Sequence, residues 1–287
     1  KNKTTLAKQS KASLVMMGFG DTQVKEEEEA RNVSGANKQE ALRKTDFSKI
    51  NAIDSQLLDE LADKLLQQMN HRLKRRMKSS KQGKIDIRHT IRKNIHSGGT
   101  FFNLERKNRR VEKYKLIVLL DVSGSMDKYS FFLLKFIWSL KSNFKDIEAF
   151  IFSTKLVRIT DYLDKSQLEH TLHLMGQNTD NWSSGTNIGA CLFDFNEQYA
   201  RRALNGKSMT IILSDGLDTG EPEVLSEQLH KIKMRTNKLV WLNPLKGMEG
   251  YQPLAKGMKA ALPEINTFES AHNLDSLLKL EKILAYV

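Results

Sequence analysis

Apolar and polar residues follow a regular order along much of this 287-residue chain, and their spacing predicts its helices and strands. From Ile53 to about Met77, apolar residues recur every three or four positions, which predicts one amphipathic helix. A shorter helix is expected over residues 86–95, because Gly98 and Gly99 follow it closely and end helical structure. Both predicted helices lie in the first 110 residues.

After residue 113 the pattern changes to short, continuous apolar runs separated by helical segments. We predict strands over residues 116–120, 147–152, 156–159, 209–213, 239–242 and 265–268. We predict helices over residues 126–140, 168–174, 224–234, 253–261 and 274–285, and one more that begins at Ile188. Strands that are apolar throughout and alternate with helices are typical of a parallel sheet covered on both faces. The sequence therefore predicts an α/β fold with a doubly wound, mainly parallel, Rossmann-like sheet.

The same patterns divide the chain into three segments. Residues 1–45 are polar, poor in aromatics and contain the acidic run Glu26–Glu29, so we expect them to be mobile or weakly ordered. Residues 46–110 form a helical, basic segment, and residues 111–287 form the sheet domain. The sequence opens on Lys1 instead of Met, which we interpret as a native N-terminus that is missing.

Positive charge is concentrated in the basic segment. Between Arg72 and Lys115 there are sixteen Lys and Arg against three acids, a net charge of +13, whereas the whole chain carries +12. Such a stretch can bind nucleic acid or another anionic surface, which leaves open a nucleic-acid-associated protein whose metal site is only structural. Aromatic residues for base stacking are sparse there, so docking to a protein partner is favoured over nucleic acid.

Cysteine usage and hydropathy bear on the compartment. Cys191 is the single cysteine, so an intramolecular disulfide is impossible, which suits a reducing compartment. Apolar runs stay well short of the roughly 20 residues that a membrane-spanning helix needs. We therefore expect a cytoplasmic protein without a membrane span.

Three short polar motifs lie at or near the ends of predicted strands: residues 121–125 (DVSGS), 184–187 (SGTN) and 214–216 (SDG). Because ligands of open α/β sheets bind at the carboxyl ends of strands, we expect these motifs to meet at one edge. Their hydroxyl and carboxylate oxygens are hard ligands, which suit Mg²⁺ or Mn²⁺. Neutral hydroxyls leave the metal partly uncompensated, so it can accept an acidic side chain from a partner. The predicted metal-binding residues are Asp121, Ser123, Ser125, Thr186 and Asp215.

Other motifs give weaker hypotheses. Asp218 is expected to be a turn residue near the site rather than a ligand. Residues 206–208 (GKS) imitate a phosphate-binding loop, but they lack its first glycine and precede a strand instead of following one. His170 and His173 have helical spacing without further metal ligands nearby, which favours surface histidines. An enzyme such as a phosphatase would need a nucleophile or base that the sequence does not single out.

The five predicted ligands resemble the metal-ion-dependent adhesion site of von Willebrand factor A (VWA) domains, in which D-x-S-x-S is joined by a distant Thr and a distant Asp. Residues 86–99, 119–126, 152–160, 213–223 and 239–263 further resemble the CoxE-like family of VWA proteins, and the resemblance runs from about Thr45 to the end. It implies a protein-binding adaptor, not an enzyme, that works with a MoxR-type AAA+ ATPase. The pair would act in chaperone-like maturation or metal-cofactor assembly of a client that presents an acidic residue to the metal.

Overall fold

The computed structural model describes residues 37–78, 84–85, 87–95, 106–107, 115–141, 143–144, 146–163 and 185–285. The chain forms two compact units, residues 1–45 and 46–287. Within the first unit, residues 37–44 are helical. The predicted helix at 168–174, His170, His173, Ser184 and most of the loops in the basic segment lie outside the described residues.

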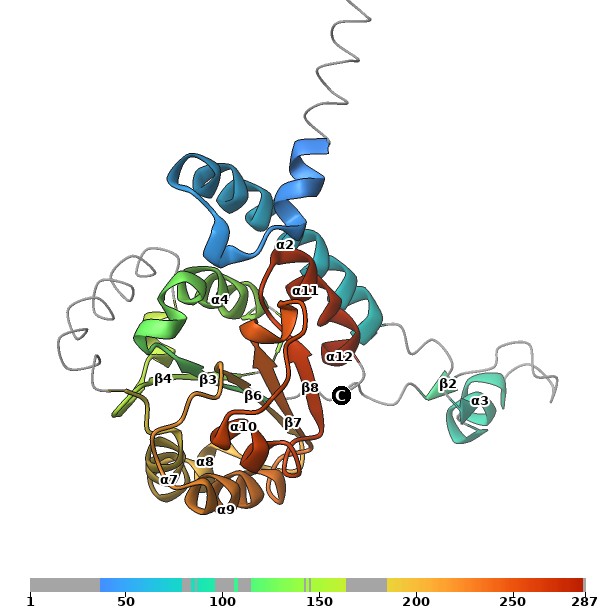
Figure 1. Cartoon of the computed structure of the whole chain (residues 1–287). Coiled ribbons are helices and arrows are strands. Elements are labelled where there is room, and N and C mark those ends of the chain that lie inside the picture. Colours follow the sequence, from blue (N-terminus) through green and yellow to red (C-terminus); the bar gives the residue numbers. More distant parts are fainter. Residues whose placement is uncertain are drawn as a thin grey trace, which may run out of the picture. The chain divides into compact units, whose positions relative to one another are not determined.

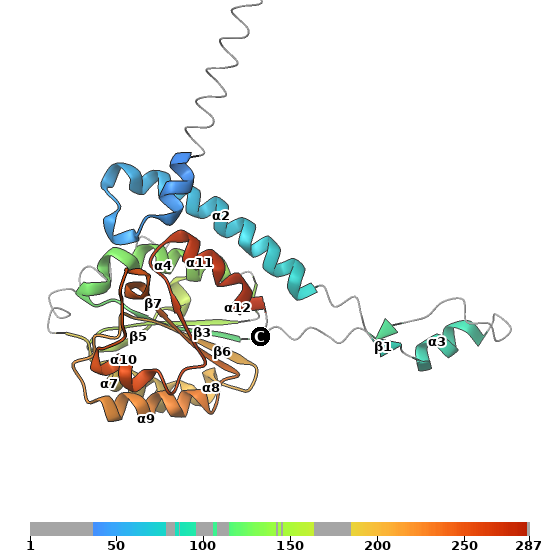
Figure 2. The same ribbon diagram turned by 45° about the vertical axis from the view of Figure 1, so that its right-hand side comes forward.

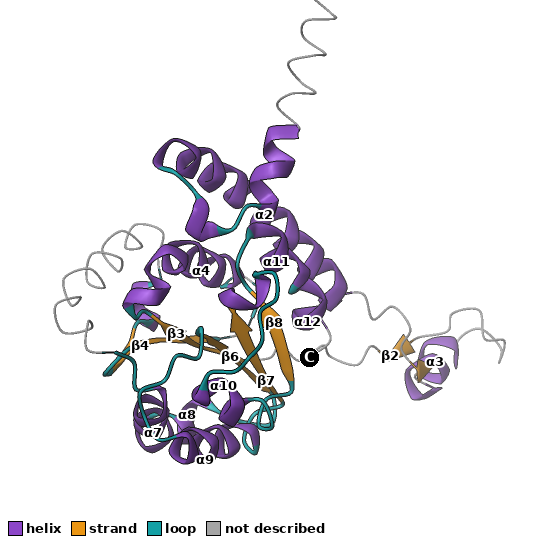
Figure 3. Ribbon diagram, viewed as in Figure 1, coloured by secondary structure: helices purple, strands orange, loops and turns teal. Residues whose placement is uncertain are grey.

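Six strands of the second unit form one sheet in the order β5–β4–β3–β6–β7–β8. Figure 3 shows the sheet in orange between two layers of helices. The strands are β3 (Lys115–Asp121), β4 (Ile147–Phe152), β5 (Leu156–Arg158), β6 (Ser208–Leu213), β7 (Lys238–Asn243) and β8 (Thr267–Ser270). All neighbours from β4 to β8 pair in parallel, and only the edge strand β5 runs antiparallel to β4. The predicted mainly parallel sheet is confirmed.

Helices cover both faces of this sheet (Figures 1 and 2). One layer consists of α2 (Ala52–Lys78), α4 (Asp127–Leu140), α11 (Leu274–Lys279) and α12 (Glu281–Ala285). The other consists of α7 (Ile188–Gln198), α8 (Ala200–Ala203), α9 (Pro222–Lys233) and α10 (Lys256–Ala261). Short 3-10 turns complete the unit: η1 (Phe47–Lys49), η3 (Gly124–Met126), η4 (Thr160–Tyr162) and η6 (Pro244–Gly247).

The basic segment contains α3 (Ile87–Asn94) and an antiparallel pair of two-residue strands, β1 (Lys84–Ile85) and β2 (Arg106–Lys107). The short strands and α8 were not predicted. The predicted last helix is two helices, because Leu280 forms a turn between α11 and α12. Strand β8 begins two residues later than predicted, and α10 begins at Lys256 because the ψ of Ala255, 141°, is not helical. Within the described residues, helices long and apolar enough to cross a membrane are not found.

The hydrophobic core lies where alternate strand residues meet the helices. Toward α7 and α9 the buried cluster includes Ile117, Phe150, Trp241, Phe195 and Leu229, each fully or almost fully buried. Side chains alternate between the two faces of a strand, so β3, buried on both faces, needs the unbroken apolar run that the sequence shows. The core therefore places the carboxyl ends of β3 and β6 rigidly side by side.

Helix α2 packs on α4, α11 and α12. Lys135 is almost fully buried on α4 and forms ion pairs with Asp59 and Asp63 of α2. Farther along α2, Arg72 Nε lies 2.7 Å from Glu281 Oε2 at the start of α12. The predicted division of residues 46–287 at residue 110 stays a prediction, and α2, on its N-terminal side, is joined to the sheet unit by these charged contacts.

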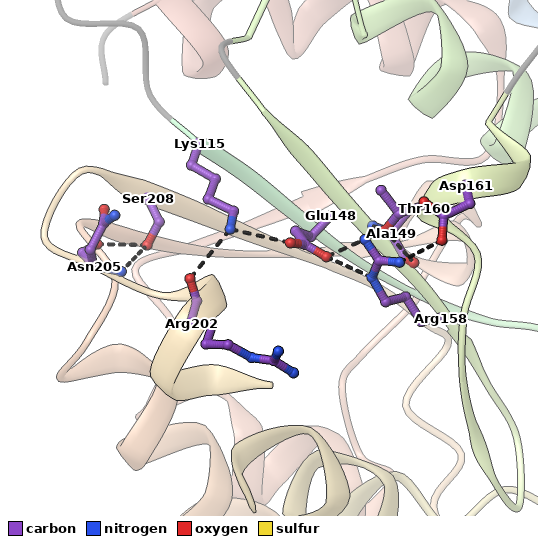
Figure 4. Close-up of polar contacts among 9 residues, drawn as sticks. All are labelled: Lys115, Glu148, Ala149, Arg158, Thr160, Asp161, Arg202, Asn205 and Ser208. Carbon is purple, nitrogen blue, oxygen red and sulfur yellow. Dashed lines mark hydrogen bonds and ion pairs between the residues drawn. The ribbon is translucent and has the colours of Figure 1, made fainter. Parts of the chain in front are cut away.

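A chain of ion pairs joins three strands at the amino-terminal edge of the sheet (Figure 4). Glu148 of β4 accepts hydrogen bonds from Lys115 of β3 at 3.3 Å and from Arg158 of β5 at 2.9 Å. Arg158 also donates to Asp161 at 2.7 Å. Burial favours a raised pKa for Glu148, but the two cations outweigh it and lower the pKa below its ordinary value. The ionised carboxylate of Glu148 thus links the edge strand β5 to β4 and β3.

Candidate metal-binding site

Two predicted carboxylates lie at the carboxyl ends of neighbouring strands. Asp121 is the last residue of β3, and Asp215 lies two residues beyond the end of β6. The strands pair in parallel, with Leu120 opposite Leu213, so both acids reach the same edge of the sheet.

The carboxylate of Asp121 is fully buried and held at both oxygens. Oδ1 accepts a hydrogen bond from the Ser123 backbone N–H at 3.0 Å, and Oδ2 accepts one from the Ser214 hydroxyl at 2.6 Å. Burial, with a smaller contribution from Asp215, raises its pKa to about 6, although the two hydrogen bonds oppose the rise. A buried anion whose charged form is penalised in this way is a favourable neighbour for a cation.

The hydroxyls of Ser123 and Ser125 lie next to this carboxylate. Their Oγ atoms are 3.2 Å apart, with Ser123 buried and Ser125 exposed. Ser123 is extended and directly precedes the turn η3, which leads into α4. The D-x-S-x-S spacing thus directs two hydroxyls to one point, where they can share a ligand.

Asp215 retains one carboxylate oxygen that is not used within the described part of the chain. Its Oδ1 accepts from the Leu217 backbone N–H at 3.0 Å, whereas the buried Oδ2 has no hydrogen-bond partner among the described residues. The backbone around it is held by Asn243, whose amide donates to the Asp215 carbonyl at 2.8 Å. Such an acceptor is costly to bury unless a ligand satisfies it.

The Thr186 loop reaches the same edge by two connections. Asn187 N–H donates to the carbonyl of Ser153, which directly follows β4, and Val122 N–H donates to Phe152 on the same strand. On its other side, Thr186 forms a parallel bridge with Asp218, and its carbonyl accepts from Thr219 N–H at 2.9 Å. Thr186 itself is buried.

Asp218 binds this loop to the loop that carries Asp215. Its Oδ1 accepts from Ile188 N–H at 2.8 Å and from Gly220 N–H at 3.2 Å. Its Oδ2 is buried and, like that of Asp215, lacks a partner within the described residues. The geometry supports a turn-forming role for Asp218, and it places a second unused acceptor beside the predicted ligands.

Cys191 lies on α7 behind these loops. Burial, with smaller effects from the charges of Asp194, Asp121 and Asp218, raises the pKa of its thiol to about 12. The buried thiol donates to the Ser153 carbonyl at 3.5 Å. It is therefore a packing residue of α7, the helix whose first residue, Ile188, donates its backbone N–H to Asp218.

The structure adds Ser214, whose role the sequence did not indicate. Besides donating to Asp121, its hydroxyl accepts from Gly216 N–H at 3.0 Å, and its carbonyl accepts from the Trp241 indole at 2.9 Å. From the loop after β6, Ser214 thus positions the carboxylate of Asp121 at the end of β3. The only signal in the sequence is a hydroxyl residue directly before Asp215.

The donor set fits a divalent cation. It consists of oxygen atoms alone, from carboxylates and hydroxyls, and it includes one buried carboxylate oxygen, Asp215 Oδ2, without a partner among the described residues. Hard cations prefer such oxygens, while zinc and copper sites are richer in nitrogen and sulfur ligands. The residues that would hold the cation are Asp121, Ser123, Ser125, Thr186 and Asp215.

Residues 57–277 match the family model described as VWA domain containing CoxE-like protein. No curated protein matches the chain significantly. Solved structures with a similar chain course include proximal thread matrix protein 1 from the mussel byssus, at 17% identity and a TM-score of 0.42 over 61% of this chain and 47% of that one. This chain thus spans about half the length of the mussel protein.

Another structure of the mussel protein has a zinc-occupied metal-ion-dependent adhesion site (MIDAS) motif. It aligns at 17% identity over 61% of this chain and 45% of that one, with a TM-score of 0.41. The conserved hypothetical protein BatB from Bacteroides thetaiotaomicron aligns at 16% identity over 60% of this chain and 96% of that one, with a TM-score of 0.39.

Proposed function

The chain belongs to the family of CoxE-like proteins that contain a VWA domain, and on this premise we propose that it is a metal-dependent protein-binding adaptor. The observation that carries the proposal is the pair of acids at one sheet edge. Asp121 has both oxygens bound by the chain, whereas Asp215 keeps one buried oxygen without a partner among the described residues. This arrangement leaves an incomplete oxygen site that a cation can occupy.

In this proposal the chain's own residues bind and orient, and they break no bonds. Ser123, Ser125 and Thr186 offer neutral oxygens, while Asp121 and Asp215 provide the negative charge. Mg²⁺ or Mn²⁺, when bound, would supply an open coordination position for an outside carboxylate. The hydroxyl of Ser214 keeps Asp121 in place, so the site does not have to reorganise when a partner arrives.

The family implies the kind of partner. We propose that one partner is a MoxR-type AAA+ ATPase and that the site receives an acidic residue of a client or of the ATPase. The complex would then act in maturation or in metal-cofactor assembly of the client. The packing of α2 on α4, α11 and α12 supports a second contact surface rigidly linked to the sheet unit.

An affinity pull-down from native lysate tests the proposal. The wild-type chain would be compared with Asp121→Ala and Ser125→Ala, in Mg²⁺ and in EDTA, and the captured proteins identified by mass spectrometry. Ser125 is exposed, so its variant removes a ligand oxygen with little effect on folding. Ser139→Ala is the matched control, because it removes a hydroxyl of α4 whose hydrogen bond, within the described part of the chain, goes to the Phe136 carbonyl.

We expect an AAA+ ATPase among the captured proteins and at least one protein that is lost in EDTA and with both site variants. Ser139→Ala should capture that protein as the wild type does. Capture that ignores EDTA and both site variants would contradict the proposal. Recovery of nucleic acid that falls steeply with salt but not with EDTA would instead favour the basic segment as the binding element.

A further inference from the structure

Two large apolar side chains are exposed beside the proposed metal site. Leu217 is 50% exposed on the loop that follows β6, and Leu254 is 63% exposed on the connection between β7 and α10. Single exposed leucines are common, but Leu217 lies two residues from Asp215, and the segment that follows Leu254 contacts the same loop, so their position needs an explanation.

Backbone contacts bring the two loops together. A Cβ on Gly257 would lie 2.7 Å from the Gly216 carbonyl oxygen and 2.9 Å from Asp218 Cβ, so only glycine allows the loops to approach this closely. Leu217 directly follows Gly216, and Leu254 lies three residues before Gly257. Along the chain, Leu217 and Leu254 each lie within three residues of the contact between Gly216 and Gly257.

Leu217 is coupled directly to one proposed ligand, Asp215, and the loop that carries Leu254 is coupled to it through Asn243. The Leu217 backbone N–H donates to Asp215 Oδ1 at 3.0 Å, which fixes where its side chain begins. On the other loop, Tyr251 accepts a hydrogen bond from Asn243, which also holds the Asp215 carbonyl. An exposed apolar side chain therefore begins at the residue whose backbone N–H holds Asp215.

We infer that Leu217 and Leu254 recognise apolar side chains next to the acidic residue that the metal site binds. The occupant is a peptide segment of a partner protein with a carboxylate residue flanked by residues such as leucine. The metal supplies attraction for the carboxylate, and the leucines gain by burying apolar surface that otherwise faces water. This inference rests on the proposed function and specifies the kind of partner that the site selects.

Binding of defined peptides by the full chain tests the inference. Two capped heptapeptides carry a central Glu, flanked on both sides by Leu in one and by Ser in the other. A third has Gln between two leucines. Dissociation constants would be measured by isothermal titration calorimetry in Mg²⁺ and in EDTA for the wild type and for the double variant L217S/L254S. Met234→Ser is the control, because Met234 is 72% exposed at the far end of α9.

We expect the Leu-flanked Glu peptide to bind the wild type about tenfold more tightly than the Ser-flanked one, and only in Mg²⁺. The double variant should bind both Glu peptides equally, and the control should keep the difference. Equal Mg²⁺-dependent binding of both Glu peptides to the wild type would overturn the inference and leave the proposed function standing. If the Glu peptides bind no better than the Gln peptide in Mg²⁺, the proposed function fails as well.

Discussion

Replacing Gly216 with alanine tests how the loop after β6 positions Asp215. Gly216 has a φ of +78°, and a Cβ there would overlap the Sδ and Cγ atoms of Met258. Met258 is fully buried on α10, so it cannot turn into solvent to make room. The substitution therefore combines backbone strain with overpacking.

The two contributions can be estimated separately. A residue with a Cβ at positive φ costs about 1–2 kcal/mol. Forcing an extra methyl into a packed interior costs about 1–3 kcal/mol. Gly216→Ala should therefore lower the free energy of unfolding by about 2–5 kcal/mol, a sizeable part of the roughly 5–15 kcal/mol typical of a domain.

Urea denaturation followed by circular dichroism measures this change, and two other glycines separate its parts. Gly250 has a φ of +73° but open space around its Cβ position, so Gly250→Ala should cost only the backbone strain, about 1–2 kcal/mol. Gly206 has neither feature among the described residues, and Gly206→Ala should be near neutral. If Gly216→Ala is no less stable than Gly250→Ala, the argument from Met258 is wrong.

Three further predictions concern other contacts. Ser214→Ala removes the donor to Asp121 and leaves Gly216 N–H without its acceptor. The affinity for Mn²⁺, measured by calorimetry, should therefore fall about 10- to 100-fold. An unchanged affinity would contradict the positioning role of Ser214. Glu148→Gln should lower the free energy of unfolding at pH 7 by about 1 kcal/mol, measured by urea denaturation. The pKa of Glu148 is lower in the folded state than its unfolded value near 4.5, so the ionised carboxylate stabilises the fold above that pH. The stability difference between wild type and Glu148→Gln should therefore shrink as pH falls through the folded pKa. A pH-independent difference would refute this. Lys135→Ala should cost about 2 kcal/mol and speed hydrogen exchange in α2 more than in β3, because its buried ion pairs with α2 are lost; uniform exchange would argue against this link.

The mainly parallel sheet was predictable because its strands and crossovers follow from local patterns, whereas the strand order comes from the structure. Each continuous apolar run is long enough for one buried strand, and the helices between runs require parallel crossovers. The positions of Asp121 and Asp215 at the edge follow from the same reasoning, since both directly or closely follow such runs. The pattern thus places both ends at one edge of the sheet, and the pairing of β3 with β6 brings them side by side.

Contacts between distant segments were not predictable in this way. Ser214 binds Asp121 only because Leu120 lies opposite Leu213, a register that hydrophobic spacing does not specify. Lys135 interrupts the apolar sequence of α4, which signals a paired buried charge, but its partners on α2 lie 72 and 76 residues earlier. Their identity depends on how two helices pack across the sheet unit.

The two edges of the sheet show why the proposed binding face is the carboxyl edge. At the amino edge, both oxygens of Glu148 are bound by Lys115 and Arg158, so the charges compensate one another within the chain. At the carboxyl edge, Asp121 is fully bound, but Asp215 and Asp218 each retain a buried oxygen without a partner among the described residues. A buried unsatisfied carboxylate oxygen costs stability unless a cation or a donor reaches it. On the proposed function, that local cost creates the affinity for the metal, and the neutral hydroxyls leave the metal enough charge to attract a partner's carboxylate.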